Sequence, residues 1–235
     1  MNITLLSALT ATAVATALLG ASAPAQAFSF GTSGITFSQD QDVKFNFKES
    51  HGGYTSSLGI YQVNGFTLAN VASLFSETKS SDNGGANEWK GTLGNTVLGS
   101  GSVVFKFLAN QVYTLGLSSA GAGMVYSTSG LNLNVASTGS QQAVFGAAAP
   151  LWSALNTEAT SKFQAAGSYT NGAGSLSNGG TLISFDDRGG GNDADFQDFT
   201  VSAEAVPEPI TMTGLALGFG GLVAARRRRA SKTVA

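Results

Sequence analysis

The chain has 235 residues, with 12 Lys and Arg, 14 Asp and Glu, 31 Gly, one His and no Cys. Five of the cations lie after residue 225, so residues 28–209 keep seven cations against fourteen acids, about seven net negative charges. This acidity argues against nucleic acid and anionic membrane surfaces as partners. The lack of Cys and the single His argue against a zinc or redox site, and we expect His51 to be a surface loop residue.

The amino-terminal stretch predicts a signal peptide over residues 1–27. An apolar run from Ile3 to Leu19 is followed by Ala25 and Ala27, the small-x-small pattern that precedes signal peptidase cleavage. No Lys or Arg occurs between Met1 and Leu9, which departs from the usual positive start. The mature chain would begin at Phe28.

Residues 28–201 predict one exported domain that is mainly β, an antiparallel, jelly-roll-like β-sandwich with one or two short helices. Abundant Gly, Ser and Thr with few charges favour short strands and tight turns. Alternating apolar and polar residues predict strands at 35–37 and 43–48, and short apolar runs predict further strands at 143–145, 181–185 and 199–201.

Two hairpins are predicted to form much of the core. In the first, strands over 58–63 and 66–68 flank Asn64-Gly65, because Asn-Gly supplies the positive φ angles of a type I′ turn. In the second, 102–108 and 112–117 flank 109–111, with Val103, Phe105 and Phe107 on one face.

Two short helices are also predicted. One runs from Asn70 to Phe75 and has an apolar face. The other begins after Pro150 and is indicated by apolar residues at about every fourth position, namely Leu151, Leu155, Ala159 and Phe163.

An acidic box lies between the last two predicted strands. Five of the fourteen acids fall between Asp186 and Asp198, around Gly189 to Gly191. Ca²⁺ takes six to eight hard oxygen ligands and tolerates an irregular loop, so we expect a calcium site with ligands Asp187, Asp193, Asp195 and Asp198. The alternative is that these aspartates form Asx turns and solvate a loop.

The carboxyl-terminal end predicts a short membrane helix. Residues 202–209 form a linker ending in Pro207, Glu208 and Pro209, and the uncharged run 210–225 follows. A helix of this length spans about 24 Å against a hydrocarbon core of about 30 Å. Residues 226–235 begin with Arg226, Arg227, Arg228 and Arg229, and such basic clusters stay cytoplasmic.

This ending resembles the PEP-CTERM sorting signal of exported bacterial proteins, in which a Pro-Glu-Pro motif, a short span and an arginine cluster are read by an exosortase. The resemblance implies export across the inner membrane, removal of the tail near Pro207 to Pro209, and a destination at the cell surface or in an extracellular matrix. The segment 185–198 resembles the box that ends an uncharacterised family of exported bacterial domains, of the form F-x-D, Gly-rich, D-x-D-F-N-D. Here Gln197 replaces the usual Asn, and the insertion over 150–180 is longer.

Two classes of function are compatible with these patterns. The favoured one is a non-enzymatic calcium-binding module that holds to exopolysaccharide or other surface proteins and contributes to biofilm structure. The alternative is a polysaccharide-active hydrolase that uses paired carboxylates, either Asp187 with Asp195 or Glu88 beside Trp89. Aromatic residues with the potential to stack on sugars are Tyr54, Tyr61, Trp89, Tyr126 and Trp152, although packing in the core is the more common role of such side chains.

Overall fold

The computed structural model describes residues 28–84, 89–132, 141–146, 176, 180–187 and 196–207. The chain from Ala27 to Val206 forms one compact unit. The predicted signal peptide, the helix after Pro150 and the membrane helix over 210–225 lie outside the described residues. Among the residues that are described, no helix is long and apolar enough to cross a membrane.

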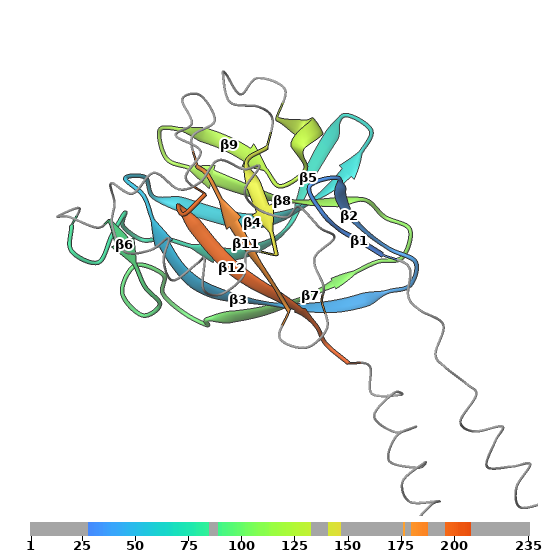
Figure 1. Ribbon diagram of the computed structural model, residues 1–235, viewed down its shortest axis with the longest axis horizontal. Helices are drawn as coiled ribbons and strands as arrows, with labels where there is room; N and C mark the ends of the chain where they lie inside the picture. The colour runs from blue at the N-terminus through green and yellow to red at the C-terminus, as the bar shows by residue number, and fades with distance from the viewer. Residues whose placement is uncertain are drawn as a thin grey trace, which may run out of the picture. The chain divides into compact units, whose positions relative to one another are not determined.

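The described residues form two six-stranded antiparallel sheets (Figure 1). Sheet I has the order β1-β2-β8-β4-β5, with β9 also beside β8. Its strands are β1 (Phe28–Gly31), β2 (Gly34–Phe37), β4 (Ser56–Asn64), β5 (Thr67–Ser76), β8 (Tyr113–Ser119) and β9 (Gly123–Tyr126). Sheet II has the order β10-β11-β12-β3-β6, with β7 also beside β3. Its strands are β3 (Gln41–His51), β6 (Lys90–Gly91), β7 (Ser102–Phe107), β10 (Ala143–Phe145), β11 (Thr181–Phe185) and β12 (Phe199–Ala205). One short 3-10 helix, η1 (Ser129–Leu131), follows β9.

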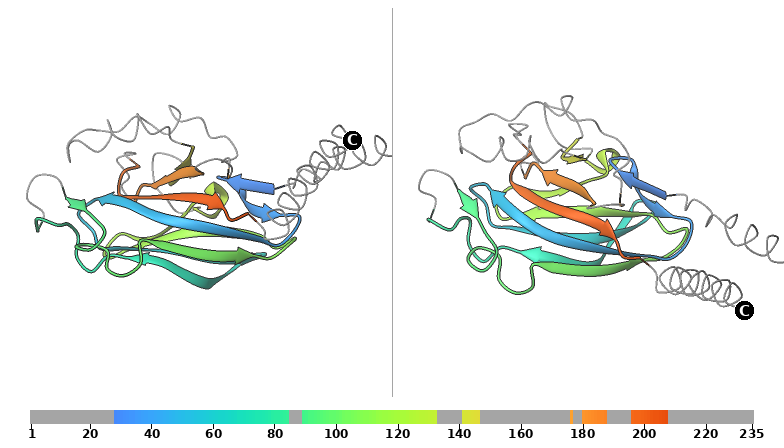
Figure 2. Two further views of the ribbon diagram at one scale, coloured as in Figure 1. Left: turned by 90° about the horizontal axis from the view of Figure 1, so that it is seen from below. Right: turned by 60° about the horizontal axis from the view of Figure 1, so that its bottom comes forward.

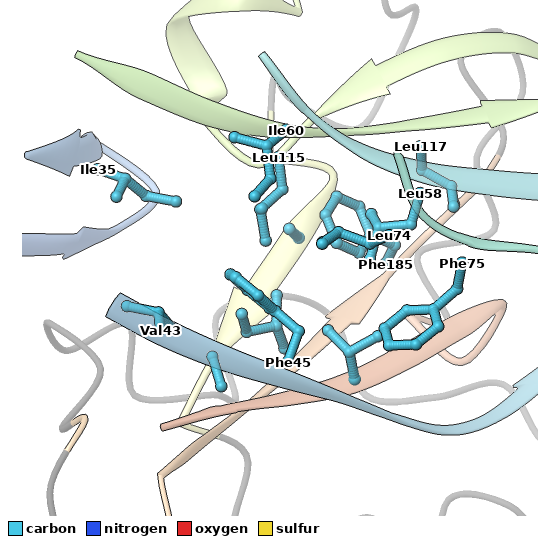
Figure 3. Close-up of a cluster of buried hydrophobic side chains, with 14 of the residues drawn as sticks. Ile35, Val43, Phe45, Leu58, Ile60, Leu74, Phe75, Leu115, Leu117 and Phe185 are labelled. Carbon is cyan, nitrogen blue, oxygen red and sulfur yellow. The ribbon is translucent and has the colours of Figure 1, made fainter. Parts of the chain in front are cut away.

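The two sheets pack face to face around a Phe-rich core, which gives the predicted sandwich-like, mainly β fold (Figure 2). Side chains from β4 and β8, such as Ile60 and Leu115, point toward Val43 and Phe45 of β3 (Figure 3). Phe47 of β3 meets Phe199 of β12 edge to face at 5.4 Å between ring centroids. The alternating burial along β3 confirms the prediction of a half-buried strand at 43–48.

The first predicted hairpin forms, but its turn lies one residue later than expected. Asn64 pairs with Thr67, so the central turn residues are Gly65 and Phe66 rather than Asn64 and Gly65. Gly65 has φ 61°, whereas Phe66 is not among the residues with positive φ. These signs of φ fit a type II′ turn, which needs glycine only at its first central position.

The second predicted hairpin is wrong. β7 pairs with β3 in sheet II, whereas β8 pairs with β2, β4 and β9 in sheet I, so the segment between them connects the two sheets. The expected apolar face of β7 is nevertheless present, because Phe107 is buried and Val103 and Phe105 pack against the core. Alternation therefore identified the strand and its buried face but not its partner.

The predicted helix from Asn70 to Phe75 is also wrong, because these residues lie within β5. Register shifts in its pairing with β4 leave extra β5 residues at Val71 and Leu74. Such bulges displace the apolar residues from strict alternation, which explains why their spacing resembled that of a helix. At the end of the domain, β12 continues to Ala205, four residues further than the predicted strand end at Val201.

Candidate functional site

Asp187 and Asp198, two of the four predicted calcium ligands, come together where the acidic box begins and ends. Asp187 follows β11 and Asp198 precedes β12. The backbone N–H of Asp187 donates to Asp198 Oδ2 at 2.7 Å, and Asp198 N–H donates to the Phe185 carbonyl at 3.0 Å. These bonds close the base of the box, whereas Asp193 and Asp195 lie outside the described residues.

Gly52 gives these two aspartates the space that they occupy. A Cβ on Gly52 would lie 2.9 Å from Asp198 Oδ1 and 3.4 Å from Asp187 Oδ2, so both carboxylates face the same backbone position. Asp187 is 3% exposed and Asp198 is 9% exposed. Both carboxylates are therefore largely shielded from solvent, and Asp198 accepts the backbone N–H of a residue eleven positions earlier rather than that of an Asx turn.

Glu77 is another buried carboxylate, and its position was not predicted. Glu77 follows β5. Its Oε1 accepts a hydrogen bond from the Ser50 hydroxyl, and its Oε2 accepts one from the Ser56 N–H at 2.7 Å. Burial raises the pKa of Glu77 to about 7, and the nearby charge of Asp187 adds to this rise. In the sequence, the buried position of Glu77 is indicated only by its place directly after an apolar strand.

His51 is buried at the end of β3, so the prediction of a surface loop residue is wrong. Its Nε2 lies 3.4 Å from Glu49 Oε1, and Glu49 Oε2 lies 2.9 Å from Lys90 Nζ on β6. Burial raises the pKa of Glu49, but hydrogen bonds and charge from His51 and Lys90 outweigh it and lower the pKa overall. Glu49 and His51 lie on β3, the strand that also holds Ser50, and Lys90 reaches Glu49 from the neighbouring β6.

Two bulky residues adopt the left-handed backbone conformation beside this site. Trp89, directly before β6, has φ 47°, and Phe196, two residues before Asp198, has φ 42°. Non-glycine residues persist in this conformation only when their surroundings fix them. The Trp89 carbonyl accepts the N–H of Gly52 at 3.3 Å, and Phe196 is buried. The backbone at Trp89 and the backbone at Phe196 are thus both held in place beside the aspartate pair.

The arrangement offers hard oxygen ligands but does not complete a metal centre. Within the described ranges, no three His, Asp or Glu side chains are grouped so that they could hold a metal ion. Asp187 and Asp198 would therefore need further ligands from 188–195. The alternative hydrolase pairs remain untested, because Asp195 and Glu88 lie outside the described residues.

Two of the aromatic residues considered for sugar stacking or core packing meet elsewhere, on sheet I. The rings of Tyr61 and Tyr126 lie 5.7 Å apart between centroids, with an interplanar angle of 85°. Burial raises the pKa of Tyr126, and Tyr61 adds to this rise. Trp89 lies beside the aspartate site instead, Tyr54 lies near Gly121, and Trp152 falls outside the described residues.

Comparison of the chain with protein-family models, curated proteins and solved structures finds no match.

Proposed function

We propose that the protein is an exported, non-enzymatic module of the cell surface or extracellular matrix, which binds calcium at the acidic box. Signal peptidase removes residues 1–27, and an exosortase reads the end of the chain and removes it near Pro207 to Pro209. The calcium-loaded domain then associates with exopolysaccharide or with other surface proteins. In this account the membrane holds the chain only through residues 210–225, before processing.

The observation that carries the calcium proposal is the meeting of Asp187 and Asp198 at Gly52. Their charges are gathered in a largely buried place, close enough to Glu77 that Asp187 raises its pKa. Buried like charges repel one another, and a divalent cation relieves the repulsion. The carboxylate oxygens are also the ligand type that Ca²⁺ prefers.

The closed base of the box supports a loop-type calcium site. The Asp187 N–H to Asp198 Oδ2 bond brings the two ends of the box together. Asp193 and Asp195 lie between these two ends in the sequence and would supply further carboxylates. With backbone carbonyls from Gly189 to Gly191, the loop has enough oxygens to complete a six- to eight-ligand shell.

The geometry gives less support to a hydrolase. A glycosidase needs two carboxyls that face each other across an open cleft. Glu77, whose raised pKa would suit a general acid, uses both oxygens to bind Ser50 and Ser56 and is only 8% exposed. Its bonds tie strands together, so we assign it a structural role.

Equilibrium calcium binding to residues 28–206 tests this proposal. We expect binding at roughly 0.1 to 1 mM, the range of extracellular calcium modules. Asp198→Asn should weaken it clearly, because the variant keeps an acceptor for the Asp187 N–H and loses only the charge. Asp40→Asn is the matched control, since Asp40 accepts a backbone N–H from Ala109 at 2.9 Å in an exposed place. Equal binding by both variants would contradict the assignment.

A further inference from the structure

The outer face of sheet I carries a corner formed by two aromatic rings. Tyr61 comes from β4 and Tyr126 from β9, and β8 lies between these strands. Both side chains are half-buried, and their rings meet nearly at a right angle. One ring therefore stands beside the other on the surface of the sheet.

The two rings lie over a pair of glycines. Gly59 and Gly116 are directly opposite each other in the pairing of β4 with β8. A Cβ on Gly116 would lie 2.6 Å from Tyr61 Cε2 and 3.2 Å from Tyr126 Cε1, and one on Gly59 would lie 3.5 Å from Tyr61 Cε2. At position 116 only glycine lets the two rings approach the sheet this closely, whereas a Cβ on Gly59 would be in ordinary contact with Tyr61.

Tyr126 is also fixed by a side chain outside the sheet. Its N–H donates to Asn132 Oδ1, and Asn132 Nδ2 donates to the Tyr126 carbonyl, both at 2.8 Å. Asn132 thus holds the backbone of Tyr126 from both sides. A ring that is positioned before a ligand arrives costs less free energy to order on binding.

Tyr61 and Tyr126 lie on a sheet whose described strands have no charged side chains. The six described strands of sheet I contain no Asp, Glu, Lys, Arg or His, although the mature span has about seven net negative charges. Exposed polar groups on β4, β5 and β8 include the hydroxyls of Ser57 and Ser118 and the amide of Asn70. Such a surface has nothing to pair with an ionic ligand, but it offers hydrogen bonds to hydroxyl groups.

We propose that this face binds a neutral saccharide, with a sugar ring packed in the corner between Tyr61 and Tyr126. The C–H face of a pyranose is apolar and packs on an aromatic ring, while its hydroxyls bond to Ser and Asn side chains. A second copy of the chain fits less well. The strand residues surrounding the corner include only one exposed large apolar side chain, Val71, whereas stable protein interfaces have an apolar, aromatic-rich centre. The neutral saccharide is the ligand class for the matrix protein proposed above. Its source, the surrounding exopolysaccharide, rests on that proposed function.

Affinity electrophoresis of the full chain in native gels tests this site. The probes are dextran, hydroxyethylcellulose and galactomannan, with alginate as the acidic comparison. We expect retardation by at least one neutral polymer and none by alginate. Tyr61→Leu and Tyr126→Leu should each weaken binding by about tenfold, because leucine still covers the glycines but has no flat ring. Tyr126→Phe should retain the binding, and Phe66→Ala, which removes an exposed ring at the β4–β5 turn, should change nothing.

Failure of this inference is distinguishable from failure of the calcium proposal. The gels are repeated with chelator, because the tyrosine corner contains no carboxylate and should bind equally without calcium. No retardation by any neutral polymer, or full retardation of both leucine variants, would overturn the saccharide site and leave calcium binding at Asp198 unaffected. Sedimentation showing a dimer that Tyr126→Leu dissociates would overturn it in favour of a second copy.

Discussion

The Glu77 carboxylate accepts a hydrogen bond from the Ser50 hydroxyl and thereby joins the two sheets near one end of the sandwich. Glu77 follows β5 of sheet I, and Ser50 lies on β3 of sheet II. The second Glu77 oxygen accepts the N–H of Ser56 at the start of β4. A single buried carboxylate thus connects three strands, and its ionisation affects the stability of the whole domain.

Stability should fall as the pH rises through the range in which Glu77 ionises. Burial raises the folded-state pKa to about 7 from an ordinary 4.5, so the folded chain holds the proton more tightly than the unfolded chain. The stabilising contribution is complete below pH 4.5 and is lost as the pH rises through 7. We expect the free energy of unfolding to lose about 3 kcal/mol from this group, measured by urea unfolding between pH 4 and pH 8.

Glu77→Gln isolates this contribution. The amide resembles the protonated carboxyl, since its oxygen accepts from the Ser56 N–H and its NH₂ donates to Ser50. The free energy of unfolding of this variant should not fall between pH 4.5 and 7, and the variant should be more stable than the native chain at pH 8. Glu204→Gln, which removes a half-buried carboxylate paired with Lys44, should keep the native pH dependence. An unchanged pH dependence in Glu77→Gln would rule out Glu77 as its source.

Phe199 and Phe66 should differ strongly in their effect on stability. Phe199 is fully buried against Phe47, so Phe199→Ala should cost about 3 to 5 kcal/mol of unfolding free energy. Phe66 is fully exposed at the β4–β5 turn, and Phe66→Ala should change the free energy by less than about 0.5 kcal/mol. Urea unfolding measures both, and a loss of several kcal/mol in Phe66→Ala would contradict the position of this turn.

The sequence pattern of both ends predicts the mass of the mature protein. If signal peptidase and an exosortase process the chain, intact mass spectrometry of the exported protein should show a start at Phe28 and no residues from Arg226 onward. Substitution of Arg226 to Arg229 by Gln should leave the tail attached, because the sorting cluster is lost. Detection of the arginines on the native surface protein would refute processing.

Local patterns predicted the strands better than their partners. Alternation identified β3, and apolar runs identified β11, because each strand buries residues whose pattern is visible in a few consecutive positions. The partner of β7 was not predictable in this way, because a short connection permits either a hairpin or a crossing to the other sheet. The bulges of β5 misled the prediction further, since an extra residue breaks the period of two.

The candidate site was predictable only where it is continuous in the sequence. Asp187 and Asp198 of the acidic box come together because they follow and precede neighbouring strands. Glu77, Gly52 and the Tyr61–Tyr126 pair come from separate strands, so only the folded chain brings them together. His51 was misjudged because its neighbouring glycines indicated a loop, whereas β3 extends to His51.

Thermal unfolding of residues 28–206 with millimolar calcium, and then with chelator, tests the calcium site most directly. A calcium concentration tenfold above the dissociation constant should add about 1.4 kcal/mol and raise the midpoint by about 3 to 6 °C. Chelator should reverse the shift, and Asp193→Ala/Asp195→Ala should abolish it. An unfolding midpoint that does not respond to calcium in the native domain would contradict the account and leave the acidic box as a closed structural loop.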